Sequence, residues 1–222
     1  MNSKTVFLML CIAAATSAGA QVRRPIRIAD PSLWVSASAG LFQANNVSDG
    51  ATASTWDFGQ ASNVQFRVAA EKAIQNQSSI GLAATYTHAP FTYHGSAGGA
   101  SCMRCAAHLD LVSLGASFHV GGGLGLHQVL EASAGVAQYR NLRRDSDGAD
   151  LAPTGGNIDP YFAFGYGFGY GFNPTMQLSV VQDIGIVLHE RTGLNSDQSN
   201  TLRQRPIRVN FRYGLGSRSR RR

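Results

Sequence analysis

Two cysteines and three histidines lie close together near the middle of the chain. Cys102 and Cys105 are separated by two residues, and His88, His94 and His108 flank them. Thiolates and imidazoles at such spacing can ligate zinc tetrahedrally. In an oxidising compartment the same two cysteines form a disulfide instead. We expect the disulfide, no metal site and no cofactor, with a zinc site as the alternative.

Several histidines, serines and glutamates have spacings that suit nucleophilic catalysis. Ser117 and His119, and likewise His127 and Glu131, are separated by even numbers of positions, which places each pair on one face of an extended strand. Such pairs arise by chance in serine-rich strands, and no catalytic motif accompanies them. We therefore assign no catalytic residue. The candidates considered are the bases His119, His127 and His189, the nucleophiles Ser117, Ser133 and Ser179, and the orienting groups Glu131 and Glu190.

The elements that position these residues are predicted to be strands. An aromatic residue stands at every second position over residues 162–172, with Ala or Gly between. Period-two alternation predicts a β-strand with one aromatic face and one nearly bare face. We expect the aromatic face to contact lipid. It comprises Phe162, Phe164, Tyr166, Phe168, Tyr170 and Phe172.

Eight alternating or apolar segments recur along the chain, separated by gaps that are alternately long and short. The short gaps contain turn-forming residues such as Gly121-Gly122-Gly123 and Asn173-Pro174-Thr175. The long gaps are polar, and the longest candidates are Asn45–Ser62 and Asn141–Asn157. The segments are Leu33–Gln43, Val64–Ala73, Ser79–His88, Ala107–Val120, Leu126–Arg140, Ile158–Phe172, Met176–Leu188 and Ile207–Leu215.

Alternation alone does not distinguish a membrane barrel from a soluble barrel of lipocalin type. The second face is poor in charge and rich in Gly, which is unusual for a surface in water and suits the narrow interior of an eight-stranded barrel. We therefore predict an all-β, eight-stranded, antiparallel up-and-down transmembrane barrel with four long extracellular loops. Its interior should hold a network of paired charges that fills the lumen. The charges assigned to it are Arg67, Glu71, Glu131, Asp183, Arg208 and Arg212.

The first twenty residues of the chain indicate export. Residues 1–20 combine Lys4, an apolar run and Ala18-Gly19-Ala20, which is typical of a secretory signal peptide. We expect a short periplasmic segment over residues 21–32, the barrel over 33–215 and a basic tail over 216–222.

Of the 19 basic residues, Lys4 lies in the leader and four arginines lie in the tail, which leaves 14 against 13 acidic ones. The net charge of +6 therefore does not indicate a nucleic-acid partner.

In architecture the chain resembles the small eight-stranded outer-membrane proteins of Gram-negative bacteria, such as the transmembrane domain of OmpA and OmpX. The resemblance covers residues 33–215 and rests on the strand and loop pattern. The segment Val209–Leu215 is similar to the closing strand that such proteins present to the insertion machinery, although Gly216 to Arg222 follow it. The resemblance implies an outer-membrane location.

The expected function is structural or surface-interacting and not enzymatic, because loops on a rigid scaffold concentrate binding variation. Expected partners are outer-membrane lipid and lipopolysaccharide, the insertion machinery during assembly, and an unidentified extracellular ligand. The alternatives are a narrow ion channel and a lipid-modifying enzyme.

Overall fold

The computed structural model describes residues 30–49, 52–59, 63–75, 77–95, 102–151, 158–189 and 201–216. Within these ranges all regular structure is β-strand, and no helix is long and apolar enough to cross a membrane. The expected signal peptide and most of the basic tail lie outside the described residues.

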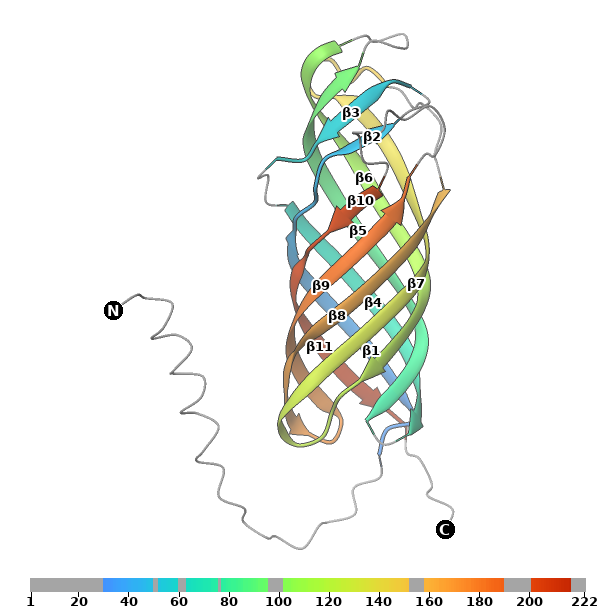
Figure 1. Ribbon diagram of the computed structural model, residues 1–222. Coiled ribbons are helices and arrows are strands. Elements are labelled where there is room, and N and C mark those ends of the chain that lie inside the picture. The colour runs from blue at the N-terminus through green and yellow to red at the C-terminus, as the bar shows by residue number, and fades with distance from the viewer. Residues whose placement is uncertain are drawn as a thin grey trace, which may run out of the picture.

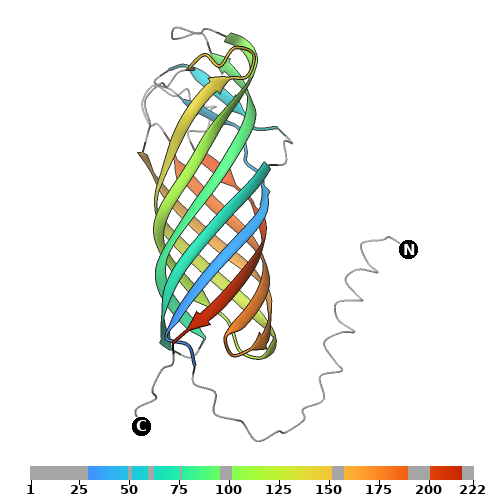
Figure 2. The same ribbon diagram turned by 180° about the vertical axis from the view of Figure 1, so that it is seen from behind.

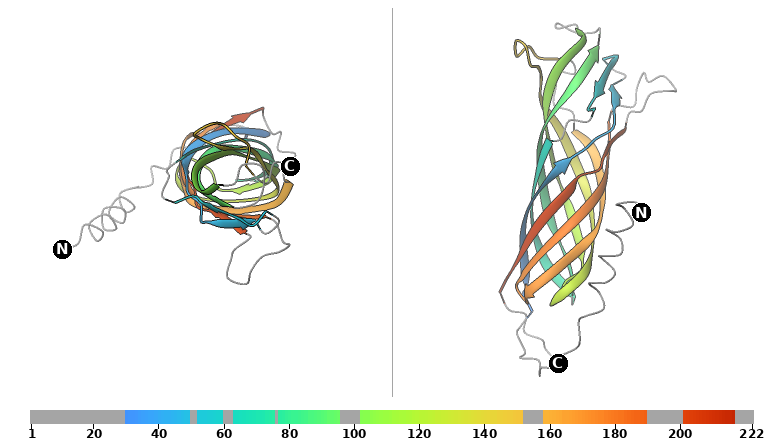
Figure 3. Two further views of the ribbon diagram at one scale, coloured as in Figure 1. Left: turned by 90° about the horizontal axis from the view of Figure 1, so that it is seen from above. Right: turned by 90° about the vertical axis from the view of Figure 1, so that its left-hand side faces the viewer.

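Eight antiparallel strands close into a barrel, as predicted (Figure 1). Each strand pairs with its neighbours along the chain, and β1 closes the barrel by pairing with β11 from Leu33–Leu215 to Leu41–Ile207. Seen from above in Figure 3, the strands form a closed ring. The barrel strands are β1 (Leu33–Phe42), β4 (Asn63–Gln75), β5 (Ser78–Gly95), β6 (Cys102–Val120), β7 (Gly125–Arg144), β8 (Ile158–Asn173), β9 (Met176–Leu188) and β11 (Ile207–Leu215).

Tight connections gather at the end of the barrel where the described chain begins and ends, which we call the turn end; the opposite end is the distal end (Figure 2). Between β6 and β7, Gly121, Gly122 and Gly123 all have positive φ, a conformation that side chains disfavour. Between β8 and β9, the carboxamide of Asn173 accepts a hydrogen bond from the amide of Thr175 at 2.9 Å. The turn residues of the sequence therefore fix the turn end.

The distal end contains more strand than the alternation predicts. Strand β5 continues to Gly95 and strand β7 to Arg144, beyond their predicted ends. Strand β6 begins at Cys102, before its predicted start. The expectation of a long second loop is therefore wrong, since strand occupies most of it. Three short strands that the sequence did not indicate also lie here: β2 (Val47–Asp49), β3 (Ser54–Asp57), which pairs with β5, and β10 (Thr201–Gln204), which pairs with β9.

One glycine-rich strand owes its composition to close strand contact. A Cβ at Gly167 of β8 would lie 2.0 Å from the carbonyl oxygen of Val180 on β9. The bare face of β8 therefore lets the neighbouring backbone approach, in addition to leaving room in the lumen.

Candidate functional site

The barrel interior has two parts, and the part nearer the turn end is charged. The structure places all six predicted lumen charges among the buried residues. They come from four strands: β4 and β11, which both pair with β1, contribute the arginines and Glu71, and β7 and β9 contribute Glu131 and Asp183. We call this set, with the hydroxyls bonded to it, the lumen network.

Arg208 is the centre of the lumen network. Its Nε donates to Asp183 Oδ2 at 2.7 Å, and its Nη2 donates to Glu131 Oε2. Glu131 also lies 3.6 Å from Arg67 Nη2 and 3.1 Å from the Nδ1 atom of His119. Buried charges are stable when they are paired in this way, so these side chains hold opposite walls of the barrel together.

A second pair lies nearer the turn end. Arg212 Nη2 donates to Glu71 Oε2 at 2.7 Å, and the guanidinium of Arg212 stacks 4.5 Å from the centroid of the Trp34 ring. Ser117 joins the two groups of charges, since its Oγ donates to Glu71 at 2.8 Å and accepts from Arg67 at 3.1 Å. The six charges therefore form one connected network across the lumen.

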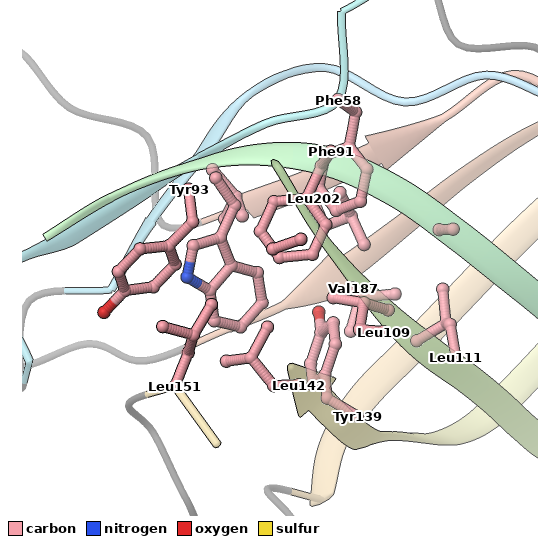
Figure 4. Close-up of a cluster of buried hydrophobic side chains, with 14 of the residues drawn as sticks. Phe58, Phe91, Tyr93, Leu109, Leu111, Tyr139, Leu142, Leu151, Val187 and Leu202 are labelled. Carbon is pink, nitrogen blue, oxygen red and sulfur yellow. The ribbon is translucent and has the colours of Figure 1, made fainter. Parts of the chain in front are cut away.

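The distal part of the interior is apolar. A cluster of buried side chains from the barrel strands, from β2 and β3 and from β10 fills it (Figure 4). Trp56 of β3 is fully buried and packs its ring 5.4 Å from that of Tyr139, and the β2–β3 hairpin thereby covers the interior. The principal members of this distal cluster are Phe42, Val47, Trp56, Phe58, Phe91, Tyr93, Leu109, Leu111, Tyr139, Leu142, Leu151, Tyr161, Val187 and Leu202.

One histidine joins the distal cluster to the hairpin that covers it. His189, which directly follows β9, is fully buried, and its Nδ1 lies 2.7 Å from Asp159 of β8. Its Nε2 lies 3.6 Å from Asp49 of β2. Burial lowers the pKa of His189, but the hydrogen bond to Asp159 and the charges of Asp159 and Asp49 outweigh burial and raise the pKa to about 9. His189 is therefore a cation between two carboxylates.

The outer face changes polarity at the same level as the interior. Towards the turn end most outward side chains are exposed and apolar, and the six aromatic residues of β8 are among them. On β5 the apolar positions are outward up to Tyr86 and inward from Ala89. The polarity of the outer face changes at paired positions on neighbouring strands, because His88 pairs with Asp110 and Asp110 pairs with Arg140. Beyond this boundary, most of the described outward residues are polar, and the apolar ones are Pro90, Met103 and Ala106.

The serines and histidines considered for catalysis are not assembled into a triad. Both ring nitrogens of His119 are engaged, with Glu131 at 3.1 Å and with the carbonyl oxygen of Gly121 at 3.0 Å. In the part of the chain that is described, no serine hydroxyl is hydrogen-bonded to a histidine. Glu190 lies outside the described residues. A base held between two other partners does not activate a nucleophile.

The two cysteines form a disulfide, Cys102–Cys105. The predicted segments place them in the long second loop, between His88 and Ala107, but they lie on β6, which corrects that position. Gly95 pairs with Cys102 and Tyr93 with Cys105, so β6 has one extra residue there, and the disulfide closes over this β-bulge. The cysteine thiolates that the alternative zinc site required are thereby consumed.

The distal cluster is what the sequence analysis missed, although a signal for it existed. On β5 the apolar residues occupy even positions from Ile80 to Tyr86 and odd positions from Ala89 to Tyr93. On β6 the same change occurs between Leu111 and Val112. When the apolar residues move from even to odd positions with no turn residue between them, the strand continues while the apolar surroundings move from its outer to its inner face.

No protein-family model matches the chain, and no curated protein sequence matches it. Several solved structures match the chain. Neisserial surface protein A is 14% identical with a TM-score of 0.54, over 83% of this chain and 97% of that one. The outer-membrane protein OprG of Pseudomonas aeruginosa is 11% identical with a TM-score of 0.45, over 86% and 100%. The N-terminal barrel of OprF, from the same organism, is 17% identical with a TM-score of 0.43, over 83% and 99%.

Of these three likenesses, the one to Neisserial surface protein A exceeds a TM-score of 0.5, and it extends over almost the whole of that chain. It supports the closed antiparallel barrel described above. The chain has the fold of the small eight-stranded outer-membrane β-barrels.

Proposed function

We propose that this protein is a non-conducting barrel of the outer membrane that serves a structural or surface-interaction role. The observation that carries the proposal is the filled interior. The lumen network crosses the barrel near the turn end, and the distal cluster occupies the other half. An eight-stranded barrel leaves an interior just wide enough for side chains.

The outward apolar surface supports the membrane location. Phe162, Phe164 and Phe168 are each about half exposed, and β11 presents Ile207, Val209 and Phe211 in the same way. An apolar surface of this extent around a whole barrel is stable in lipid and not in water. Outer-membrane lipid, including lipopolysaccharide, is therefore the first partner that we propose, and the insertion machinery is required for assembly.

The distal surface is the proposed site of interaction with an extracellular ligand. The extended β5–β6 hairpin and the end of β7 project beyond the apolar belt (Figure 1). The distal cluster holds them from inside, and the disulfide braces β6, so this surface is a strand-built platform. Rigid scaffolds reduce the entropy lost on binding. Arg104, Met103 and Arg143 are exposed on it.

Conductance across a planar bilayer tests the proposal. The purified, folded protein should produce no steps above the background, because the lumen network and the distal cluster fill the interior. The variant Arg208→Gly, which removes the central side chain, is the positive control for detection of a widened lumen. Regular ion-selective steps from the wild-type protein would contradict the proposal and favour the narrow channel.

The enzyme alternative has its own test. Mass spectrometry of lipid A from cells with and without the gene should give identical spectra. A mass difference equal to an acyl chain or a headgroup would contradict the non-enzymatic role. The engagement of His119 by Glu131 and Gly121 supports the expected result.

A further inference from the structure

Two histidines lie side by side on the outer face, at the level where the polarity changes. His88 of β5 and His108 of β6 occupy neighbouring strands, and their ring centroids are 5.0 Å apart. Both are accessible from outside the barrel, His88 at 56% and His108 at 28% of the side chain. Neither belongs to the lumen network or to the distal cluster.

A carboxylate holds each ring by the same nitrogen. His88 Nδ1 lies 2.9 Å from Asp110 Oδ1, and His108 Nδ1 lies 2.6 Å from Asp145 Oδ1. A carboxylate that accepts from Nδ1–H fixes the tautomer whose Nε2 carries a free lone pair, which is the arrangement found around metal-binding histidines. Within the described residues, no hydrogen bond engages Nε2 of either ring.

The chain also builds a support for the first of these carboxylates. Asp110 accepts from the Tyr86 hydroxyl at 3.0 Å and from Asn141 Nδ2 at 2.6 Å, in addition to His88. Asn141 reaches it from a β-bulge in β7 and has a φ of 51°, a conformation that is strained for a side-chain-bearing residue. Bulges often redirect a side chain towards a functional site.

We propose that His88 and His108 bind a borderline divalent cation such as Zn²⁺ or Cu²⁺ through their Nε2 atoms. With zinc–nitrogen distances of about 2.0–2.1 Å and a tetrahedral angle, the centroids of two ligating rings lie about 5 Å apart. Imidazole suits these metals, whereas Mg²⁺ and Ca²⁺ prefer oxygen ligands. The described chain arranges no group of three or more ligating side chains, so water or another molecule's donor completes the coordination.

The test is titration of the tag-free, full mature chain with ZnCl₂ in detergent micelles, followed by calorimetry. Purification without reductant keeps Cys102 and Cys105 disulfide-bonded, so that they offer no thiolate. We expect one Zn²⁺ per chain, and at least a tenfold loss of affinity in the double variant His88→Gln/His108→Gln. With Cu²⁺ as the second probe, electron paramagnetic resonance should show coupling to two nitrogens in the wild-type protein.

His94→Gln is the matched control, because His94 is also on β5 but its Nδ1 bonds the carbonyl oxygen of Met103 and not a carboxylate. It should bind Zn²⁺ as the wild type does. Asn141→Gly tests the support of Asp110, because it removes the hydrogen bond from Asn141 Nδ2. Glycine accepts the positive φ, so thermal stability should be kept while Zn²⁺ affinity falls about 10- to 100-fold.

Either of two kinds of result would overturn the proposal. One is Zn²⁺ uptake that the double variant His88→Gln/His108→Gln leaves unchanged, or no uptake at all by the wild type. The other is an equal loss of affinity in His94→Gln, which would indicate binding by scattered surface histidines. Retained heat-modifiable migration of every variant on electrophoresis shows that the barrel is folded in each comparison.

Discussion

The two halves of the barrel interior are built from the same strands with opposite chemistry. Near the turn end, Arg208, Glu131 and Asp183 fill the lumen while the outer face is apolar. At the distal end, Leu109 and Tyr139 fill it while the outer face carries His108 and Arg140. A protein surface matches its surroundings, so the inversion indicates that lipid surrounds one half and water the other.

The two kinds of filling also differ in how they stabilise the barrel. The lumen network depends on pairing, because an unpaired charge inside the barrel is costly. The distal cluster depends on apolar area removed from water, as in a soluble protein. The distal half is therefore a small soluble core that continues from the membrane part without a break in the strands.

The largest effect should come from removing the central charge of the lumen network. Arg208→Met leaves Asp183 and Glu131 buried without their main partner and should lower the free energy of unfolding by about 3–5 kcal/mol. Urea unfolding in lipid vesicles measures it. Arg203→Met on the exposed side of β10 is the control and should change stability by less than about 0.5 kcal/mol. Equal effects of the two variants would show that the network is not a stabilising unit.

A charge placed on the outer face should lower stability in the half that lipid surrounds and leave it unchanged in the other half. Phe168→Arg places a cation in the apolar belt and should cost about 2–4 kcal/mol near the membrane midplane. Ala106→Arg is also outward and exposed on β6, but beyond the boundary, and should be close to neutral. The same urea unfolding measures both. A similar cost at both positions would contradict the boundary placed at His88, Asp110 and Arg140.

Alkaline pH should loosen the distal half alone. The pKa of His189 in the folded protein, about 9, lies above its ordinary value of 6.5, so its ion pairs stabilise fully below pH 6.5 and are lost as the pH rises through about 9. Chymotryptic cleavage beside Trp56 should therefore be faster at pH 9.5 than at pH 6.5. His189→Gln should remove this difference. An unchanged pH dependence in that variant would assign the effect to another group.

The smallest effect should come from the disulfide. It closes a ring of four residues, so it restricts the unfolded chain only slightly and supports a local bulge. Intact-mass analysis without reductant should show two hydrogens fewer than the dithiol form. The Cys102→Ser/Cys105→Ser variant should keep the unfolding free energy of the barrel within about 0.5 kcal/mol. A loss of several kcal/mol would mean that the distal half controls global stability.

Most of the fold could be predicted from the sequence, because barrel strands and turns leave local signals. The alternation from Phe162 to Phe172 and the glycines at 121–123 correspond to β8 and to the β6–β7 turn. The predicted ends at His88 and Arg140 were too early, since the apolar parity changes there while the strand continues. The hairpin of β2 and β3 was missed because strands of three and four residues carry too short a pattern.

The sequence by itself determined which residues alternate, and therefore which side chains share a face of each strand. Only the tertiary structure decided which of them meet. Arg208 and Glu131 are 77 positions apart, and Trp56 reaches Tyr139 and His189 from a different connection. Closure of the barrel brings these groups together, because pairing of β1 with β11 joins the ends of the sheet. Such contacts depend on strand register and barrel geometry, which no local pattern specifies.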